Sequence, residues 1–187
     1  MATTFGKAGS GLADAPWAAN ADVARVGANG ERRTAKILGG LNHPIVVVHD
    51  VRIPIPGFTA NIDHVVVFGT KVWLIDSKVW KPATYRTVFG RTFRGWRRFK
   101  FADSKTIPMA VEAFGRIGLT LERPMMVVHS SKPSSKVGLR WFRPRSASAL
   151  TSDGLQRWVS KMNRKAVGST RVADPAVMST LLPLVHR

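Results

Sequence analysis

Two aspartates and a lysine lie close together in the apolar stretch 61–80, which reads NIDHVVVFGTKVWLIDSKVW. The Gly-Thr pair between its two β-branched runs is typical of a hairpin with a two-residue turn. A turn of that length sets the strand register, which places Asp63 directly opposite Asp76 with Lys78 on the same face. Carboxylates this close repel each other unless a cation lies between them. The pattern therefore indicates an ion pair with Lys78, a divalent metal such as Mg²⁺, or both.

A solvated, salt-bridged face is the alternative interpretation of these charges. The residues around them are almost all apolar, which indicates a central hairpin, and charge in a central strand is costly unless it has a function. We therefore interpret the hairpin as a metal or catalytic site. His64 falls on the opposite face, where we expect a hydrogen-bonded core histidine.

The composition indicates a polyanionic partner. The chain has 187 residues with 29 Lys and Arg against 11 Asp and Glu, a net charge of +18. Such a balance favours nucleic acid, because basic side chains displace counterions from phosphates, and a merely basic or ribosome-like surface is the alternative. The lack of cysteine excludes disulfides and Cys-ligated zinc. No apolar run reaches the roughly 18 residues of a membrane span, and no signal peptide is apparent, so we expect a cytoplasmic protein with no membrane partner.

Aromatic and basic residues interleave in the stretch 81–101, which predicts a second hairpin turning near Gly90 or Gly95. One interpretation places the aromatic rings in the core and the basic groups in water. Another makes the basic groups a phosphate-binding edge beside the site. Base stacking on the aromatic rings is the interpretation that the pattern favours least. The predicted nucleic-acid contacts are Arg86, Arg91, Arg94, Arg97, Arg98 and Lys100.

The remaining elements predict an α/β (α+β) fold, a mixed central sheet with helices on its faces. Residues 1–15 are Gly-rich and aperiodic, and we expect a mobile tail. A helix is expected over 20–41, broken near Gly27–Gly30. Glu31 would then lie in a first turn, where its carboxylate interacts favourably with the helix dipole. Strands are predicted at 45–51, 124–130 and 137–142, and helices at 103–120, 154–163 and 175–185.

Four short motifs resemble the nuclease-related domain (NERD) family, which is similar to the PD-(D/E)XK restriction-endonuclease-like superfamily. They are Gly30-Glu31, His49-Asp50-Val51, the run NIDHVVV from Asn61, and the run IDSKVW from Ile75. The resemblance implies a restriction-endonuclease-like domain over 16–145, with 146–187 as a helical extension packed on it. Family members often carry a Gln on the helix after a Pro, whereas here Pro108 is followed by Met-Ala-Val-Glu.

The resemblance also implies the role of each site residue. Asp63 would be the metal-binding acid of the central strand, and Asp76 and Lys78 the acid and lysine of the Asp-x-Lys motif. Glu31 would complete the metal shell from the helix, in place of the dipole role, and the Ser77 carbonyl would be a further ligand. The implied metal is Mg²⁺, with Mn²⁺ as the alternative.

Three functions compete on these grounds. The first is a Mg²⁺-dependent DNA endonuclease or nickase, which would need to form a dimer for concerted double-strand cutting. The second is a non-cleaving DNA-binding module of a larger assembly. The third is a basic RNA-binding or structural protein in which the acids are salt-bridge partners. The complete set of Glu31, Asp63, Asp76 and Lys78 favours the first.

Overall fold

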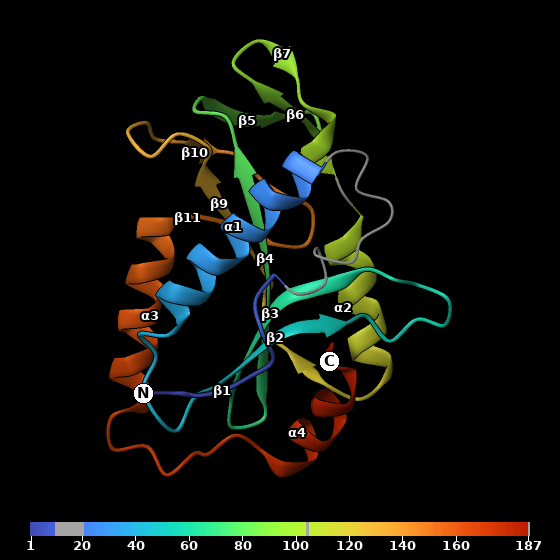
Figure 1. Ribbon diagram of the computed structural model, residues 1–187, viewed down its shortest axis with the longest axis vertical. Helices are drawn as coiled ribbons and strands as arrows, with labels where there is room; N and C mark the ends of the chain where they lie inside the picture. Colours follow the sequence, from blue (N-terminus) through green and yellow to red (C-terminus); the bar gives the residue numbers. More distant parts are fainter. Residues whose placement is uncertain (10–20, 104, 187) are drawn as a thin grey trace.

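The computed structural model describes residues 1–9, 21–103 and 105–186 and has an α+β fold, as predicted (Figure 1). A seven-stranded mixed sheet has the order β1-β2-β3-β4-β9-β11, with β8 beside β4. Its strands are β1 Thr3–Phe5, β2 Val46–Arg52, β3 Asn61–Phe68, β4 Lys71–Trp80, β8 Thr120–Leu121, β9 Met125–Ser130 and β11 Ser148–Thr151. The helices are α1 Ala21–Leu38, α2 Thr106–Arg116, α3 Ser152–Ala166 and α4 Pro175–Leu181, with 3₁₀ turns η1 Lys100–Asp103 and η2 Leu182–Leu184.

A separate four-stranded sheet lies at the end of β4 and has the order β10-β5-β6-β7. Its strands are β5 Thr84–Val88, β6 Arg91–Arg94, β7 Arg97–Arg98 and β10 Gly138–Trp141. The chain turns at both Gly90 and Gly95, each with positive φ, so the predicted hairpin is a three-stranded meander. We refer to this unit as the small sheet.

The central hairpin has the register expected from its turn. Phe68 pairs with Lys71, and the ladder continues to His64 and Ile75. On its other edge β4 runs parallel to β9, so β4 is a central strand, as its apolar sequence indicated. The two charged positions of β3 and β4 are therefore next to each other within the sheet.

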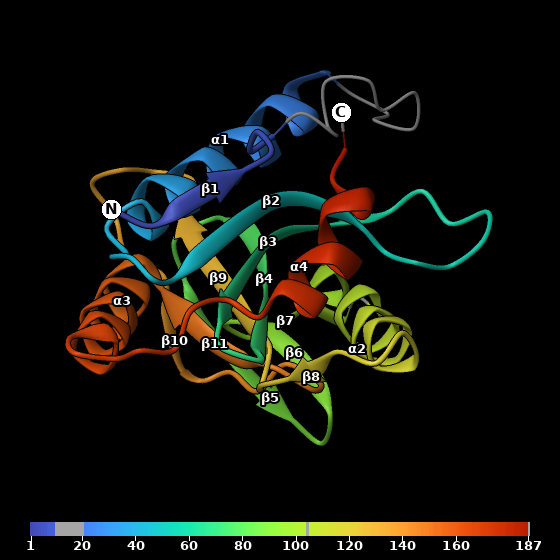
Figure 2. The ribbon, with the colours of Figure 1, turned by 90° about the horizontal axis from the view of Figure 1, so that it is seen from below.

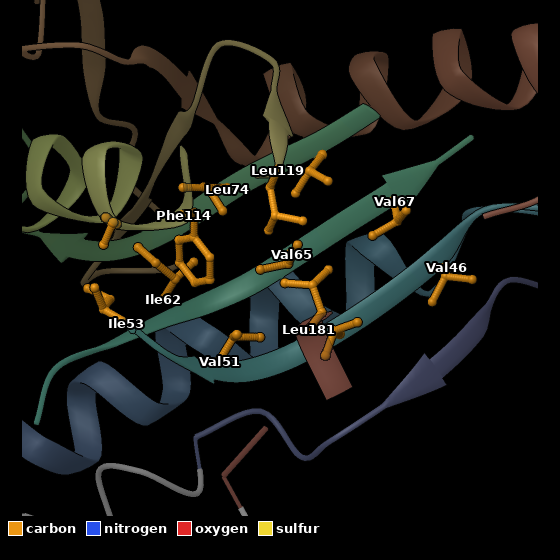
Figure 3. Close-up of a cluster of buried hydrophobic side chains, with 14 residues drawn as sticks. Val46, Val51, Ile53, Ile62, Val65, Val67, Leu74, Phe114, Leu119 and Leu181 are labelled. Atoms are coloured by element: carbon orange, nitrogen blue, oxygen red, sulfur yellow. The ribbon is translucent and has the colours of Figure 1, made fainter. Parts of the chain in front are cut away.

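Helices cover both faces of the main sheet. Figure 2 shows α1 and α3 on one side and α2 and α4 on the other. Phe114 of α2 and Leu181 of α4 pack on Val65 and Leu74, as Figure 3 shows. On the opposite face Leu38 of α1 and Leu155 of α3 lie in a second cluster, whose members from the sheet include Val66, Ile75 and Val127.

Three sequence-based expectations were wrong. Thr3–Phe5, expected in a mobile tail, form β1 and pair in parallel with β2, while residues 10–15 of that tail lie outside the described residues. The stretch 146–187, expected to be helical, contributes the strand β11 beside β9. The third concerns α1, which runs without a break through Gly27 and Gly30. None of the helices within the described ranges is both long and apolar enough to cross a membrane.

Gly30 allows α1 to lie directly on β4. A Cβ atom at this position would stand 2.5 Å from Cγ2 of Val79, far inside a normal contact. Gly30 is therefore a site of close approach rather than a helix breaker, which explains why a glycine is retained at a buried helical position despite its low helix propensity. The close contact brings α1 against β4 beside Lys78.

Substitution Gly30→Ala is expected to destabilise the fold by about 1–3 kcal/mol, because overpacking outweighs the gain in helix propensity. The matched control is Gly115→Ala in α2, where an added Cβ meets nothing within 4 Å and alanine should stabilise by up to about 1 kcal/mol. Urea unfolding of both variants measures the difference. Stabilisation by both substitutions would contradict a close approach at Gly30.

Candidate active site

Three aspartates occupy neighbouring positions on three adjacent strands. The β2–β3 pairs His49–His64 and Val51–Ile62 place Asp50 opposite Asp63. On its other side β3 pairs with β4, where His64 lies opposite Ile75. The next position along this register places Asp63 opposite Asp76. The site therefore has one acid from each of β2, β3 and β4.

The β3–β4 ladder opens at these acids. The next hydrogen-bonded pair would be Ile62 with Ser77, but the backbone N–H of Ser77 donates to Oδ2 of Asp63 at 2.6 Å instead. The N–H and C=O of one residue in a strand point the same way, so the Ser77 carbonyl also faces the β3 side. The local opening thus brings a backbone carbonyl and the Asp63 carboxylate to one place.

Lys78 provides the cation that the paired carboxylates require. Its Nζ donates to Oδ1 of Asp76 at 2.8 Å and lies 2.8 Å from Oδ2. Burial acts to lower the pKa of Lys78, but the charges of Asp76, Asp63 and Glu31 outweigh it and the pKa is raised. Lys78 is therefore an ammonium ion in this arrangement.

Glu31 joins the site from the middle of α1, not from a first turn as expected. Burial is the main cause that raises its pKa to about 7, with a further contribution from Asp50, whereas a hydrogen bond from the Gly9 backbone and the charge of Lys78 act to lower it. The pKa of Asp63 is also raised, by burial, then by Asp76 and Glu31. The acids therefore interact electrostatically as one group.

Asp50 is a site residue that the sequence reasoning did not assign. It is buried, has φ of +55°, and its Oδ1 accepts a hydrogen bond of 2.6 Å from Nδ2 of Asn61. A non-glycine residue in the left-handed region is uncommon and concentrates at functional sites. The available signal was an acid near the end of an otherwise apolar strand in a chain with only 11 acids.

A buried chain of hydrogen bonds passes behind the carboxylates. Nδ1 of His49 and Nδ1 of His64 lie 2.8 Å apart, and Nε2 of His64 lies 3.3 Å from Oγ of Ser77. Ser77 Oγ donates to Oγ1 of Thr34 at 2.8 Å, which lies 2.7 Å from Nε2 of His129. Nδ1 of His129 lies 2.9 Å from Oγ of Ser152 at the start of α3. His64 is a hydrogen-bonded core histidine, as expected.

One placement of protons satisfies every group in this chain. Burial lowers the pKa of His49 and His64, and it lowers that of His129 to about 4, so all three rings are neutral near pH 7. If His49 donates to His64, each following group donates to the next as far as Ser152. A hydrogen bond of His64 with the Glu31 backbone adds α1 to the network. The network therefore ties α1 and α3 to the strand that carries Ser77.

Five of the six predicted nucleic-acid contacts lie on the small sheet, and the sixth, Lys100, begins η1 two residues after β7. All six lie outside the cluster of acids. Four of them are exposed: Arg91, Arg97, Arg98 and Lys100. Arg86 and Arg94 are half-buried, and Arg94 lies against the inner residues Tyr85 and Phe99. These six basic residues are therefore spatially separate from the acids of the candidate site.

The donor set suits a hard divalent ion. Carboxylates and a backbone carbonyl are the ligands that Mg²⁺ and Mn²⁺ prefer. Asp76 is only 3% exposed, and the ion pair with Lys78 is the one contact found for its Oδ2 within the described residues, so this oxygen could also bind a cation. Within 1–9, 21–103 and 105–186, however, no three acidic or histidine side chains stand close enough together to hold an ion as they are. The Lys78 ammonium takes the place of a cation beside Asp76.

Comparison with known proteins agrees with the sequence motifs. Residues 26–113 match the family described as the nuclease-related domain, a range that extends from α1 into α2 and includes all four acids and Lys78. No curated protein and no solved structure matches the chain. The resemblance inferred from the motifs is therefore confirmed at the level of the family.

Substitution Glu31→Gln should stabilise the metal-free protein at alkaline pH. The folded chain keeps this proton up to about pH 7, whereas the unfolded chain releases it near pH 4.5. Stability therefore falls as the pH rises through that window, by about 3 kcal/mol for a shift of this size. In EDTA, the glutamine variant should equal the wild type at pH 4.5 and exceed it at pH 8, measured by urea unfolding.

Exposed Glu112, which pairs with Arg116, provides the matched control for this prediction. Glu112→Gln is expected to change the stability by less than about 0.5 kcal/mol at either pH. A parallel pH dependence of the wild type and Glu31→Gln would contradict a raised pKa at Glu31.

Substitution Thr34→Val should cost about 2–4 kcal/mol, because it keeps the shape but removes the acceptor of the Ser77 hydroxyl proton and the hydroxyl partner of His129 Nε2, both of them buried. Thr180→Val is the control, since the Thr180 hydroxyl bonds the Ala176 carbonyl at an exposed site. Thermal and urea unfolding compare the two variants. Equal costs would show that the buried chain adds nothing to stability.

Proposed function

We propose, from the match of residues 26–113 to the nuclease-related domain, that the protein is a metal-dependent deoxyribonuclease that hydrolyses phosphodiester bonds. The observation that carries the proposal is the opening of the β3–β4 ladder, where Asp63, Asp76 and Lys78 meet. A merely structural hairpin would continue its ladder and would place apolar residues there. The strong positive charge of the chain favours DNA as the substrate.

The residues proposed to hold Mg²⁺, or alternatively Mn²⁺, are Asp63, Asp76, Glu31 and the Ser77 carbonyl. Asp50 is added to them because of its position beside Asp63. When bound, such an ion lowers the pKa of water and neutralises charge on the phosphate. In the metal-free state burial is the main cause that raises the pKa values of Asp63 and Glu31, and the charges of the neighbouring acids add to it.

Lys78 is proposed to act on the phosphate as a cation. In the metal-free structure the neighbouring acids raise the pKa of Lys78, so the side chain is an ammonium ion that could stabilise the developing negative charge. Asp76 holds Nζ at 2.8 Å, so the ammonium is oriented before substrate arrives. The side chain is about a third exposed and can therefore reach a bound phosphate.

A non-cleaving DNA-binding module is the second candidate. One observation favours it: no three ligands in the described part of the chain are already arranged to hold an ion. Repulsion among the acids could also explain that arrangement. The ligands would then come together only when a cation is bound. Cleavage assays distinguish the two candidates.

Supercoiled plasmid incubated with Mg²⁺ or Mn²⁺ should be nicked or linearised, and EDTA should abolish the reaction. Lys78→Met should reduce the rate by about 10²–10³-fold through loss of transition-state stabilisation. Asp76→Asn should abolish metal-dependent cleavage. The product bands on an agarose gel, followed over time, measure each rate.

Lys71→Met is the matched control, because Lys71 lies at the other end of β4 and pairs with Glu122 at the surface. It should cleave at the wild-type rate. Binding without cleavage under every metal would reject the nuclease in favour of the non-cleaving module. Equal loss of activity in both lysine variants would reject the specific role of Lys78.

A further inference from the structure

We propose that the outer face of the small sheet binds single-stranded DNA by stacking unpaired bases on its aromatic rings. We refer to this face as the aromatic platform and define it by Arg86, Phe93, Trp96, Arg98 and Trp141. The choice of DNA rests on the proposed function, whereas the preference for unpaired bases rests on the platform alone.

The pairing of the small sheet separates an inner and an outer face. Tyr85 and Thr92 are buried on the inner face, where Tyr85 packs on Trp80 and Phe99. The alternating positions, Arg86 and its partner Phe93, belong to the outer face. Trp141 of β10 pairs with Arg86 and so extends this face across a third strand.

Several rings that could have filled the core are in water. Trp96 is 87% exposed and Trp141 is 59% exposed, while Phe89 and Phe101 are 99% and 82% exposed. The interpretation that the aromatic residues of the stretch 81–101 pack inward is therefore correct for Tyr85 but wrong for Phe89, Trp96 and Phe101. Exposed large rings gathered in one region mark an interaction surface, because isolated exposure would scatter them over the molecule.

Guanidinium groups pack against the platform rings. The Arg86 guanidinium lies 4.3 Å from the centre of the Trp96 ring, and that of Arg98 lies 5.9 Å from the centre of the Phe93 ring. Arg140 lies 5.2 Å from the Trp141 ring. Such cation–π contacts hold the guanidinium group and the ring in place, while the ring keeps exposed area on which a base can stack.

The charge of this region fits a polyanion and disfavours an ordinary protein partner. The stretch 81–101 contains seven basic residues and no acidic residue, and the stretch 131–145 also lacks an acid. Aromatic rings beside cations are the combination that binds single strands, because bases stack on the rings while phosphates pair with the cations. Duplex DNA already stacks its bases on each other, so it can use the cations but not the rings.

The small sheet that carries the platform is attached through its inner face to the strand of the proposed site. β4 carries Asp76 and ends at Trp80, four residues or about 13 Å further along the strand. The Trp80 ring packs on Tyr85, Phe99 and Phe142, with centroids 4.6–5.3 Å apart. These contacts fix the position of the small sheet relative to Asp76, and the proposed substrate is DNA with a single-stranded segment.

Fluorescence anisotropy in EDTA tests the platform without any cleavage. The probes are a labelled oligo-dT of about 20 nucleotides and a labelled duplex of equal length. The wild type should bind the single strand more tightly than the duplex. Trp96→Ala and Trp141→Ala should each weaken single-strand binding about tenfold while changing duplex binding less than about twofold, because only unpaired bases stack.

Arg97→Ala is the matched control for charge. Arg97 is exposed on β7, and its loss should weaken binding of both probes and reduce the slope of log affinity against log salt by about one. The two tryptophan variants should keep the wild-type salt slope. Both tryptophans are exposed, so neither alanine variant is expected to disturb folding, and circular dichroism verifies this.

Intrinsic fluorescence gives a second measurement. The oligo-dT should quench tryptophan emission, and the quench should fall in Trp96→Ala. The quench should persist in Trp73→Phe, because Trp73 lies on β4 of the main sheet, where its ring packs on Trp158 of α3. Equal affinity for single strand and duplex, or a tryptophan variant that weakens both probes alike, would overturn the proposal.

The outcome is separate from that of the nuclease proposal. Selective single-strand binding without any cleavage would support the platform and reject the nuclease. Metal-dependent cleavage with no loss of single-strand binding in either tryptophan variant would support the nuclease and reject the platform. A protein partner on this face would be indicated if the tryptophan variants changed only the association state in sedimentation, which would also overturn the proposal.

Discussion

Repulsion between carboxylates on adjacent strands is the constraint on which the rest of the site depends. Asp50, Asp63 and Asp76 occupy one row across β2, β3 and β4, and a row of acids in a central sheet is stable only with compensation. Lys78 supplies a cation, and the Ser77 N–H bonds to Asp63 in place of its strand partner. The opened ladder accommodates the row of acids and is the feature on which the proposed chemistry rests.

The buried chain from His49 to Ser152 explains how the opened ladder stays in place. A gap between two central strands would lose backbone hydrogen bonds, so neighbouring elements must fix its geometry. Thr34 on α1 and Ser77 on β4 share a hydrogen bond, and His64 connects the same two elements. Neutral rings suit this purpose, since charged histidines beside one another would add repulsion within the core. The network and the close contact at Gly30 together determine where Glu31 lies.

The residues proposed for catalysis and the residues proposed for DNA binding lie in different parts of the molecule. The acids of the proposed site lie on the main sheet and on α1, while the small sheet carries arginines and exposed aromatic rings. This separation has an electrostatic reason, because arginines placed among the acids would pair with them and neutralise the site. β4 runs through the site and ends under the small sheet, so one continuous strand sets the distance between the two functions.

The sequence alone determined the central hairpin and its register, because a two-residue turn and the alternation of side chains are local properties. It therefore placed Asp63, Asp76 and Lys78 together, and its motifs indicated the family. Only the tertiary structure decided what depends on contacts between distant segments. Helix α1 is continuous, and the close approach of Gly30 to Val79 lets it present Glu31 to the site from mid-helix. Strand pairing reveals Asp50 as a member of the row of acids, and the second sheet turns Trp96 and Trp141 outward. Alternation of side chains along a strand indicates that the two faces of the sheet differ, but tertiary packing decides which face is covered.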